Sequence, residues 1–222
     1  MKIYAVNGGP RKKHNTAKLL QAALSGAAAA PCAEAVETEM IHLYDLDFQG
    51  CMSCFACKRL GAKSYGRCGF KDALSPVLEK LSQADGIIFG SPIYFGNVTG
   101  KLRCLLERLL FAYLVYDKAY STLAPKRMPT AFLYDMNVSR EEMEQYGYRS
   151  GLERMEMFVG RIFSRPAVLH ICNTYQFDDY SKYRAERFSE PEKAAWRDSH
   201  FPLDLAEAGR MGAAMVTGGR QT

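Results

Sequence analysis

The sequence predicts an α/β fold built on a doubly wound parallel sheet. Short apolar runs rich in β-branched and aromatic residues alternate along the chain with longer segments of helical periodicity. Some of the short runs are almost continuously apolar, as in strands buried on both faces, and parallel neighbours need the helical crossovers that the longer segments supply. With 222 residues, 48% of them hydrophobic, the chain can bury a sizeable core, and we expect one domain over residues 1–222.

The N-terminal part predicts the first strand, helix and second strand. Lys2 to Val6 is a short apolar strand, and the glycine-containing loop Asn7 to Asn15 follows it. The Ala/Leu-rich segment from Thr16 to Ala30 predicts a helix, for which Asn15 and Thr16 are good caps because their short side chains can accept from orphan amides. Glu37 to Leu43 predicts the second strand.

The remaining elements continue the alternation. Asp72 is expected to open a helix, since the apolar residues that follow it recur at helical spacing. The run GIIFGSPIY, residues 86–94, predicts a buried strand. Further along we expect a helix at Gly100 to Leu114, a strand at Met128 to Tyr134, a long amphipathic helix at Arg140 to Phe163, a strand at Ala167 to Cys172 and a final helix at Glu190 to Met215 that contains a helix-breaking Phe201-Pro202 pair.

Five strands connected in this way indicate the flavodoxin-like architecture, with strand order 2-1-3-4-5 and helices on both faces. We expect a cysteine-rich insertion at about 48–71 and a C-terminal helical extension at about 175–222. Ligands of open α/β sheets lie beyond the carboxyl ends of the strands, where the winding direction reverses. The site is therefore expected where the loops Asn7 to Asn15, Ser91 to Thr99 and Asp135 to Ser139 meet.

Composition and charge exclude several classes of function. The net charge of +5 comes from 29 basic and 24 acidic residues, which are scattered. No helix-turn-helix, zinc-finger or aromatic-basic pattern indicates nucleic acid binding. The first apolar run is too short for a signal peptide, and no stretch reaches the roughly 18 apolar residues that span a bilayer. We expect a cytoplasmic protein with reduced thiols and no membrane partner.

The first loop, NGGPRKKHNT, has the features of a phosphate site. It matches neither a Walker A loop nor a dinucleotide fingerprint. Its glycines let backbone amides turn toward an anion, and the helix that follows presents its N-terminus. Arg11 and Lys13 are the candidate cationic partners, although a solvated surface would explain the same basic run. A phosphate monoester suits this loop.

The second loop, GSPIYFGNVTGKLR, is irregular and carries apolar residues that a surface loop normally avoids. Ile93, Tyr94 and Phe95 follow one another in it. We expect a flat, partly apolar ligand to cover these side chains. The alternative is that they pack into the core or into a subunit interface.

These residues carry a resemblance to the NADPH-dependent FMN reductase group of the flavodoxin-like superfamily, and within it to the iron-sulfur flavoproteins and their cluster-free relatives. Three motifs match in order over about the first half of the chain. They are the loop with Gly8-Gly9-Pro10-Arg11 and Asn15-Thr16, the cysteine insertion, and SPIYFGNVTG from Ser91. One departure is that Gly9 stands where the family usually has a serine, which removes a hydroxyl donor to phosphate.

The resemblance implies that the protein binds FMN without a covalent bond. The first loop of the family holds the phosphate, and the second borders the isoalloxazine ring. The residues that these roles assign to phosphate are Gly9, Pro10, Arg11, Lys13, Asn15 and Thr16, and those assigned to the ring are Pro92, Ile93, Tyr94, Phe95, Gly96 and Asn97. Asp135, Met136 and Asn137 are added from their position alone.

Four of the seven cysteines, Cys51, Cys54, Cys57 and Cys68, fall within eighteen residues. The C-x2-C-x2-C triplet with one more distant cysteine follows the logic of [4Fe-4S] ligation. Zinc could use the same sulfurs, although the overlapping spacings crowd one side of a tetrahedron. The ten-residue gap before Cys68 is longer than the iron-sulfur members of the family usually have, so reduced thiols packed near the flavin are the alternative.

The function expected is that of an FMN-dependent oxidoreductase that takes electrons from NAD(P)H. Its acceptor would be a small molecule such as a quinone, or a redox protein, and a [4Fe-4S] cluster would relay single electrons. Because the chemistry resides in the flavin, no side chain is assigned a catalytic role. The alternatives are an FMN-binding electron carrier without turnover of its own, and a structural zinc protein. The apolar loop and long helix predict a homodimer or homotetramer.

Overall fold

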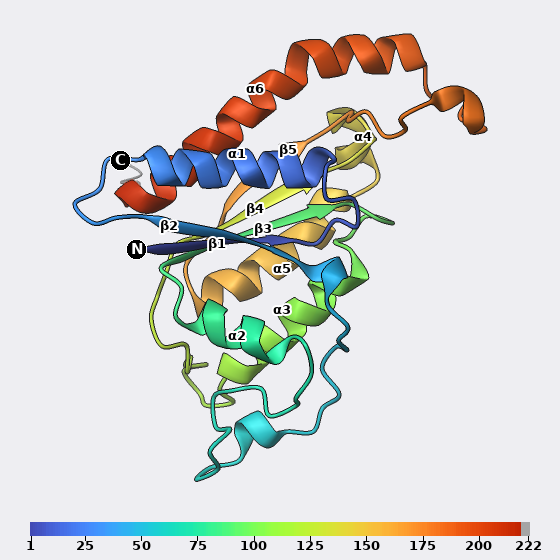
Figure 1. The fold of residues 1–222 in the computed structure, drawn as a ribbon. Coiled ribbons are helices and arrows are strands. Elements are labelled where there is room, and N and C mark those ends of the chain that lie inside the picture. Colours follow the sequence, from blue (N-terminus) through green and yellow to red (C-terminus); the bar gives the residue numbers. More distant parts are fainter. Residues whose placement is uncertain (219–222) are drawn as a thin grey trace.

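A computed structural model describes residues 1–218, so the last four residues of the predicted domain and extension lie outside the described part. Five parallel strands form one sheet in the order β2-β1-β3-β4-β5, which confirms the predicted flavodoxin-like topology (Figure 1). The interior strand β1 pairs with β2 and β3, so that Val6 lies between Ile41 and Phe89. The strands are β1 Lys2–Asn7, β2 Glu37–His42, β3 Gly86–Pro92, β4 Thr130–Asp135 and β5 Ala167–Ile171.

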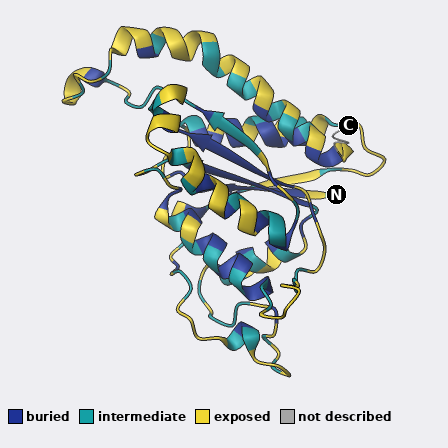
Figure 2. Ribbon diagram, turned by 180° about the vertical axis from the view of Figure 1, so that it is seen from behind, coloured by how far each residue is buried: buried dark blue, intermediate teal, exposed yellow. Residues whose placement is uncertain are grey.

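Helices cover both faces of the sheet, and each face has its own apolar core (Figures 1 and 2). The helices α1 (Asn15–Ala29) and α6 (Glu190–Thr217) lie on one face. The other face carries α2 (Ser75–Ser82), α3 (Gly100–Tyr113) and α5 (Tyr148–Ile162). Alternate residues of each central strand point to opposite faces, as the pleat requires, and this explains why these strands are apolar throughout.

The predicted helix from Arg140 to Phe163 is wrong as a single element. The structure has a short helix α4, Arg140–Gln145, followed by α5. Gly147 separates them with a φ of +68°, a left-handed conformation that ends one helix and redirects the chain. A capping box at Ser139 and Glu142 starts α4.

The final helix α6 runs without interruption through Pro202, so the Phe201-Pro202 pair does not end it. Ser189 caps this helix by accepting from the amide of Glu192. The axis of α6 changes direction along its length in Figure 1, as a proline inside a helix predicts. Among residues 1–218, no helix combines the length and the apolar character that crossing a bilayer requires.

Two expected helix starts are also corrected. His14 occupies the N-cap position of α1 and makes no capping bond. The side chains of Asn15 and Thr16, which were expected to cap this helix, donate to partners elsewhere in the fold. The helix α2 begins at Ser75, and Asp72 lies in the turn before it. In both cases a polar side chain that was expected to cap the helix is hydrogen-bonded to a residue distant in the sequence instead.

The cysteine insertion leaves the sheet after β2, through the 3-10 turn η1 (Leu43–Asp45), and packs against the C-terminal half of α3. Inside it the 3-10 turn η2, Ala56–Lys58, places Lys58 beneath the end of α3. Its ammonium donates to the carbonyls of Phe111, Ala112 and Leu114, which have no partner within the helix. This contact ties the insertion to the domain.

Candidate functional site

Three loops meet beyond the carboxyl ends of β1, β3 and β4, where the sheet topology places a ligand. The amide of Gly8 donates to the carbonyl of Gly90 at 2.8 Å. The hydroxyl of Thr99 donates to the carbonyl of Gly8 at 2.7 Å, and it also caps α3. The amide of Ile93 donates to the carbonyl of Asp135 at 2.9 Å. The loops predicted from the sequence therefore form one connected edge.

The two glycines of the first loop lie in tight surroundings. A Cβ atom on Gly8 would lie 2.8 Å from the Cβ of Leu102, which is closer than packed atoms approach. A Cβ on Gly9 would lie 3.0 Å from Oγ1 of Thr16 and 3.1 Å from Oδ1 of Asn7. The amide of Gly9 donates to Asn7 at 2.8 Å. A side chain at position 9 would therefore require the side chains of Asn7 and Thr16 to shift by a few tenths of an ångström.

A buried pair joins the first loop to β4. The hydroxyl of Thr16 donates to Oδ1 of Asp135, and both side chains are buried. Burial raises the pKa of Asp135 to about 6, against the opposing effects of the Thr16 hydroxyl and the Arg11 guanidinium. Thr16 reaches the site but directs its hydroxyl to this carboxyl group. The site thus contains a carboxyl group beside the expected phosphate loop.

The segment after β5, residues 173–187, lies on the first loop. Arg11 donates to the carbonyl of Gln176 at 2.7 Å, and Asn15 donates to that of Tyr175 at 3.0 Å. The side-chain oxygen Oε1 of Gln176 accepts from the side-chain nitrogen Nδ2 of Asn137 at 2.9 Å. Gln176 therefore links the loop after β1 to the loop after β4. The only sequence feature that could have indicated this role of Gln176 is the group of aromatic residues around it.

The second loop ends in a tight turn that presents an aromatic side chain to solvent. Tyr94 and Asn97 exchange backbone hydrogen bonds of 2.8 and 3.0 Å across it. The φ angles of Phe95 and Gly96 are +51° and +75°, and a phenylalanine in this region is strained. Phe95 is fully exposed, at 105%. A strained, exposed aromatic residue suits a surface that contacts a ligand or partner.

The other predicted ligands lie around the same edge. Asn97 uses its side-chain oxygen to accept from the amide of Val98, while Tyr148 of α5 packs beneath Gly96. Pro10 and Lys13 are exposed, Pro92 and Ile93 are partly buried, and Met136 is buried. Sequence reasoning missed Lys193, a buried residue that donates to the carbonyl of Asn137 at 2.5 Å. Burial lowers the pKa of Lys193 to about 8.

The four clustered cysteines line one pocket of the insertion. The same pocket is lined by Arg108, Phe111 and Ala112 of α3, and no carboxylate lines it. Gly100 to Arg108 spans about 12 Å of helix at about 1.5 Å per residue. The thiols thus lie toward the opposite end of α3 from the second loop, rather than against the predicted flavin site.

The donor set of this pocket suits an iron-sulfur cluster, whose ligands occupy separate corners. The cavity of this pocket is about 20 Å³, room for about one water molecule. Over residues 1–218 no three His, Cys, Asp or Glu side chains are placed to share a single metal ion. None of the four cysteines forms a disulfide in the described part of the chain.

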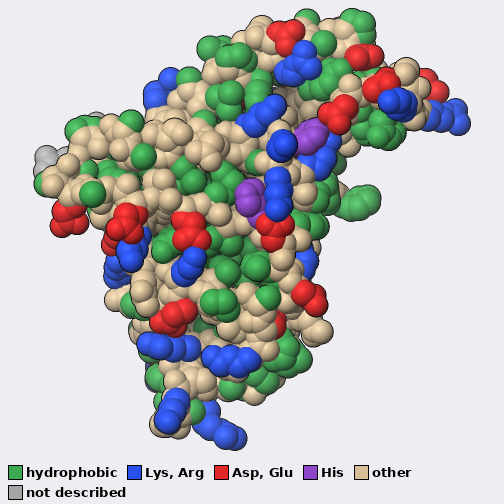
Figure 3. Space-filling view, in the orientation of Figure 1, with side chains coloured by type: hydrophobic (Ala, Val, Ile, Leu, Met, Phe, Trp, Pro, Cys, Tyr) green, Lys and Arg blue, Asp and Glu red, His purple; other side chains and the backbone are tan. Residues whose placement is uncertain are grey.

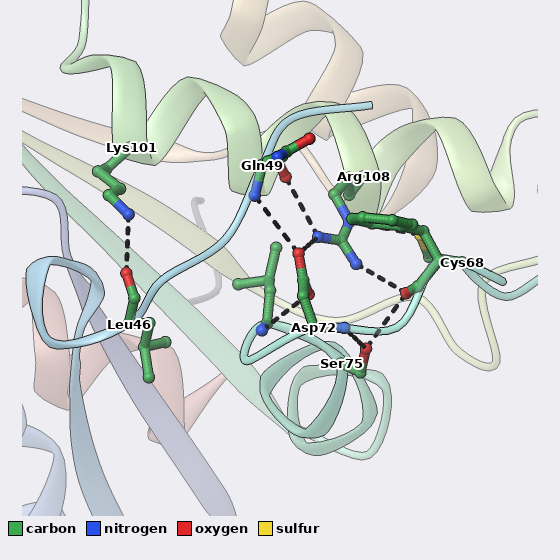
Figure 4. A network of polar contacts seen from close by, with 9 residues as sticks. Leu46, Gln49, Cys68, Asp72, Ser75, Lys101 and Arg108 are labelled. Carbon is green, nitrogen blue, oxygen red and sulfur yellow. Dashed lines mark hydrogen bonds and ion pairs between the residues drawn. The ribbon is translucent and has the colours of Figure 1, made fainter. Parts of the chain in front are cut away.

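Beside these thiols lies a buried arginine that the sequence analysis did not single out (Figure 4). Nε of Arg108 donates to Sγ of Cys68 at 3.4 Å, and Nη1 forms an ion pair with Asp72. The guanidinium also donates to the carbonyls of Gln49 at 3.1 Å and Phe70 at 3.0 Å. A signal was present, because Arg108 follows Leu105 by three residues on the apolar face of α3.

A more open pocket of about 380 Å³ lies on the other side of Cys68 and Arg108. Lys63, Arg67 and Lys71 of the insertion are among the residues that line it. In Figure 3, Lys and Arg side chains gather at the bottom of the view, where the cysteine insertion lies in Figure 1. The cysteine pocket is therefore next to a basic, solvent-accessible surface.

Comparison with known proteins identifies a family model and related sequences that each match about half of the chain. A protein-family model described as NADPH-dependent FMN reductase matches residues 1–128. An iron-sulfur flavoprotein of Methanocaldococcus jannaschii is 39% identical over 108 residues, which cover 49% of this chain and 51% of the relative. An iron-sulfur flavoprotein of Archaeoglobus fulgidus is 41% identical over 113 residues, 49% of this chain and 48% of the relative. The chain spans about half the length of these relatives.

Solved structures resemble the chain over nearly its whole length. An NAD(P)H:quinone oxidoreductase from Methanothermobacter marburgensis has a TM-score of 0.65 and 18% identity, and the match covers 96% of this chain and 98% of that one. An FMN-dependent NADH-azoreductase from Bacillus anthracis, in complex with FMN, has a TM-score of 0.63 and 12% identity, with 97% and 99% covered. At these identities the likeness establishes the shared fold.

Proposed function

The chain belongs to the NADPH-dependent FMN reductase family, and on that premise we propose that it binds FMN and transfers electrons from NAD(P)H to an acceptor. The observation that carries the proposal is the single edge formed by the three loops, with Arg11 and the N-terminus of α1 on one side and exposed aromatic residues on the other. The first of these surfaces suits a phosphate group, and the second suits an apolar ring.

In this proposal the loop from Gly9 to Thr16 holds the phosphate, and the residues Pro92 to Asn97 border the ring. Bound FMN supplies hydride and single-electron chemistry. The protein orients the ring and limits access to it. The solved structures named as a quinone oxidoreductase and an NADH-azoreductase support a small-molecule acceptor, while the basic pocket beside Cys68 suits an acidic redox protein.

The four cysteines are proposed to hold a [4Fe-4S] cluster. The iron-sulfur flavoproteins matched over about half of the chain support this, as does the shared pocket. Its chemistry would be the relay of single electrons. Four reduced thiols are the alternative, and iron and sulfide analysis of anaerobically purified protein separates the two.

The test of the flavin proposal is a titration of folded apoprotein with FMN, followed by anaerobic reduction with NADPH and NADH. We expect saturable binding of one FMN, bleaching of its visible absorption by a nicotinamide donor, and turnover with a quinone or ferricyanide. Binding with negligible turnover would favour the electron carrier. Absence of saturable binding would overturn the proposal.

Replacing Arg11 by glutamine should weaken FMN binding about tenfold to a hundredfold, because a charge-assisted hydrogen bond to phosphate contributes about 1.5–3 kcal/mol. Fluorescence titration measures the change. Riboflavin, which lacks the phosphate, should bind both proteins equally. Arg59, an exposed residue of the cysteine insertion, provides the control substitution Arg59→Gln. An equal loss of riboflavin affinity would show that Arg11 acts on the fold rather than on phosphate.

We also propose that the protein forms a homo-oligomer through exposed apolar surface. Phe95, Phe158 and Leu203 are exposed at 105, 42 and 64%. Sedimentation at micromolar concentration should give a mass of at least two chains. A monomer at that concentration would contradict the proposal.

A further inference from the structure

Arg108 is the only charged residue that lines the cysteine pocket in the described part of the chain. Its side chain is 1% exposed, and its donors all point at the insertion. Two acceptors, Gln49 and Phe70, lie at the two ends of the insertion, so the guanidinium holds these ends together. Its Nε donates to a thiol that the proposed function makes a cluster ligand.

We propose that Arg108 is a positioning residue that orients Cys68 and raises the reduction potential of the cluster held by the four cysteines. The inference rests on the proposed function. Four thiolates give the pocket a large negative charge, and each added electron makes it more negative. A buried cation in hydrogen-bond contact with a sulfur ligand favours the reduced state, because hydrogen bonds and charge near the sulfurs set the potential.

The placement of Asp72 gives this effect a direction. Asp72 is the ion-pair partner of Arg108 but does not line the cysteine pocket. The pair therefore presents its positive end to the thiols and its negative end away from them (Figure 4). Removing Arg108 leaves the negative charge of Asp72 beside the pocket, and removing Asp72 leaves the positive charge of Arg108. Both side chains are little exposed, so solvent screens either change weakly.

The experiment is a redox titration of the iron-loaded protein with dithionite under anaerobic conditions, followed by electron paramagnetic resonance. One electron enters the cluster for each step, and no bond or proton at the guanidinium changes. Arg108→Gln should lower the potential, shifting the ratio of reduced to oxidised cluster at least tenfold, or about 59 mV for one electron. Asp72→Asn should shift it in the opposite direction.

Two further variants separate positioning and charge from folding. Arg108→Lys keeps the charge and loses the Nε donor, so its shift should be smaller than that of Arg108→Gln. The double variant Arg108→Gln/Asp72→Asn removes both charges and should lie between the single variants. Arg103→Gln, on the exposed side of α3, should leave the potential unchanged.

The outcomes distinguish this proposal from the one on which it depends. Wild-type protein that takes up no iron and sulfide overturns the cluster, and with it the role of Arg108. Iron-loaded variants with unshifted potentials, or with Asp72→Asn and Arg108→Gln shifted in the same direction, overturn the role of Arg108 alone. If Arg108→Gln does not fold, the absence of a positive shift in Asp72→Asn is sufficient to overturn it.

Discussion

Replacing Asp135 by asparagine should raise the free energy of unfolding at pH 7 by about 3 kcal/mol. Burial raises the pKa of Asp135 from 3.8 to about 6, so this carboxyl group costs stability wherever it is ionised in the native state. Two pH units at about 1.36 kcal/mol each give the magnitude. Asparagine keeps an oxygen that accepts from Thr16 while it removes the buried charge.

The raised pKa of Asp135 makes the free energy of unfolding depend on pH. Between about pH 4 and pH 6 the native protein holds a proton that the unfolded chain releases, so wild-type stability falls as pH rises through this interval. Urea unfolding at several pH values should show this slope in the wild type and its loss in Asp135→Asn. The two proteins should be nearly equal below about pH 4. A variant that is less stable than wild type at pH 7 would contradict the assignment.

Asp85 provides a matched control of opposite sign. Burial acts to raise its pKa, but its hydrogen bonds from Lys126 and from the amide of Lys2 lower it overall. Its carboxylate therefore stabilises the native state at neutral pH. Asp85→Asn should be less stable than wild type at pH 7, whereas Asp135→Asn should be more stable.

Replacing Gly212 by alanine should lower the free energy of unfolding by about 3 kcal/mol, the upper end of the usual cost of overpacking. A Cβ at this position would lie 1.8 Å from the carbonyl oxygen of Ala23 in α1. This neighbour is backbone, so the two helices must separate to admit the methyl group. Gly26 faces α6 in the same way, with a Cβ position 1.9 Å from the carbonyl of Gly209.

Gly209 on the same helix supplies the control. A Cβ on Gly209 would lie 3.6 Å from the carbonyl of Ala22, which is ordinary contact. Gly209→Ala should therefore stabilise the protein by about 0.5–1 kcal/mol, because glycine is costly inside a helix. Urea unfolding compares the two variants. Equal effects of the two substitutions would show that the close approach of α1 and α6 is not the cause.

Local periodicity was sufficient to predict most of the fold. The five strands are short apolar runs between segments of helical spacing, and this alternation allows few topologies. The division of the predicted helix at Arg140 to Phe163 was missed because Gly147 adopts a left-handed conformation there. The predicted final helix is confirmed, and it continues through Pro202. Whether a glycine or proline ends a helix depends on the packing around it.

The sequence by itself determined the α/β alternation, the loops that carry the candidate flavin site and the group of four cysteines. Only the tertiary structure decided that Thr16 donates to Asp135, that Gln176 joins two loops, and that Arg108 lies between Asp72 and Cys68. The reason is separation along the chain. Periodicity and turn chemistry act over a few residues, while these contacts join residues 36 to 165 positions apart, whose charge and burial depend on the completed fold.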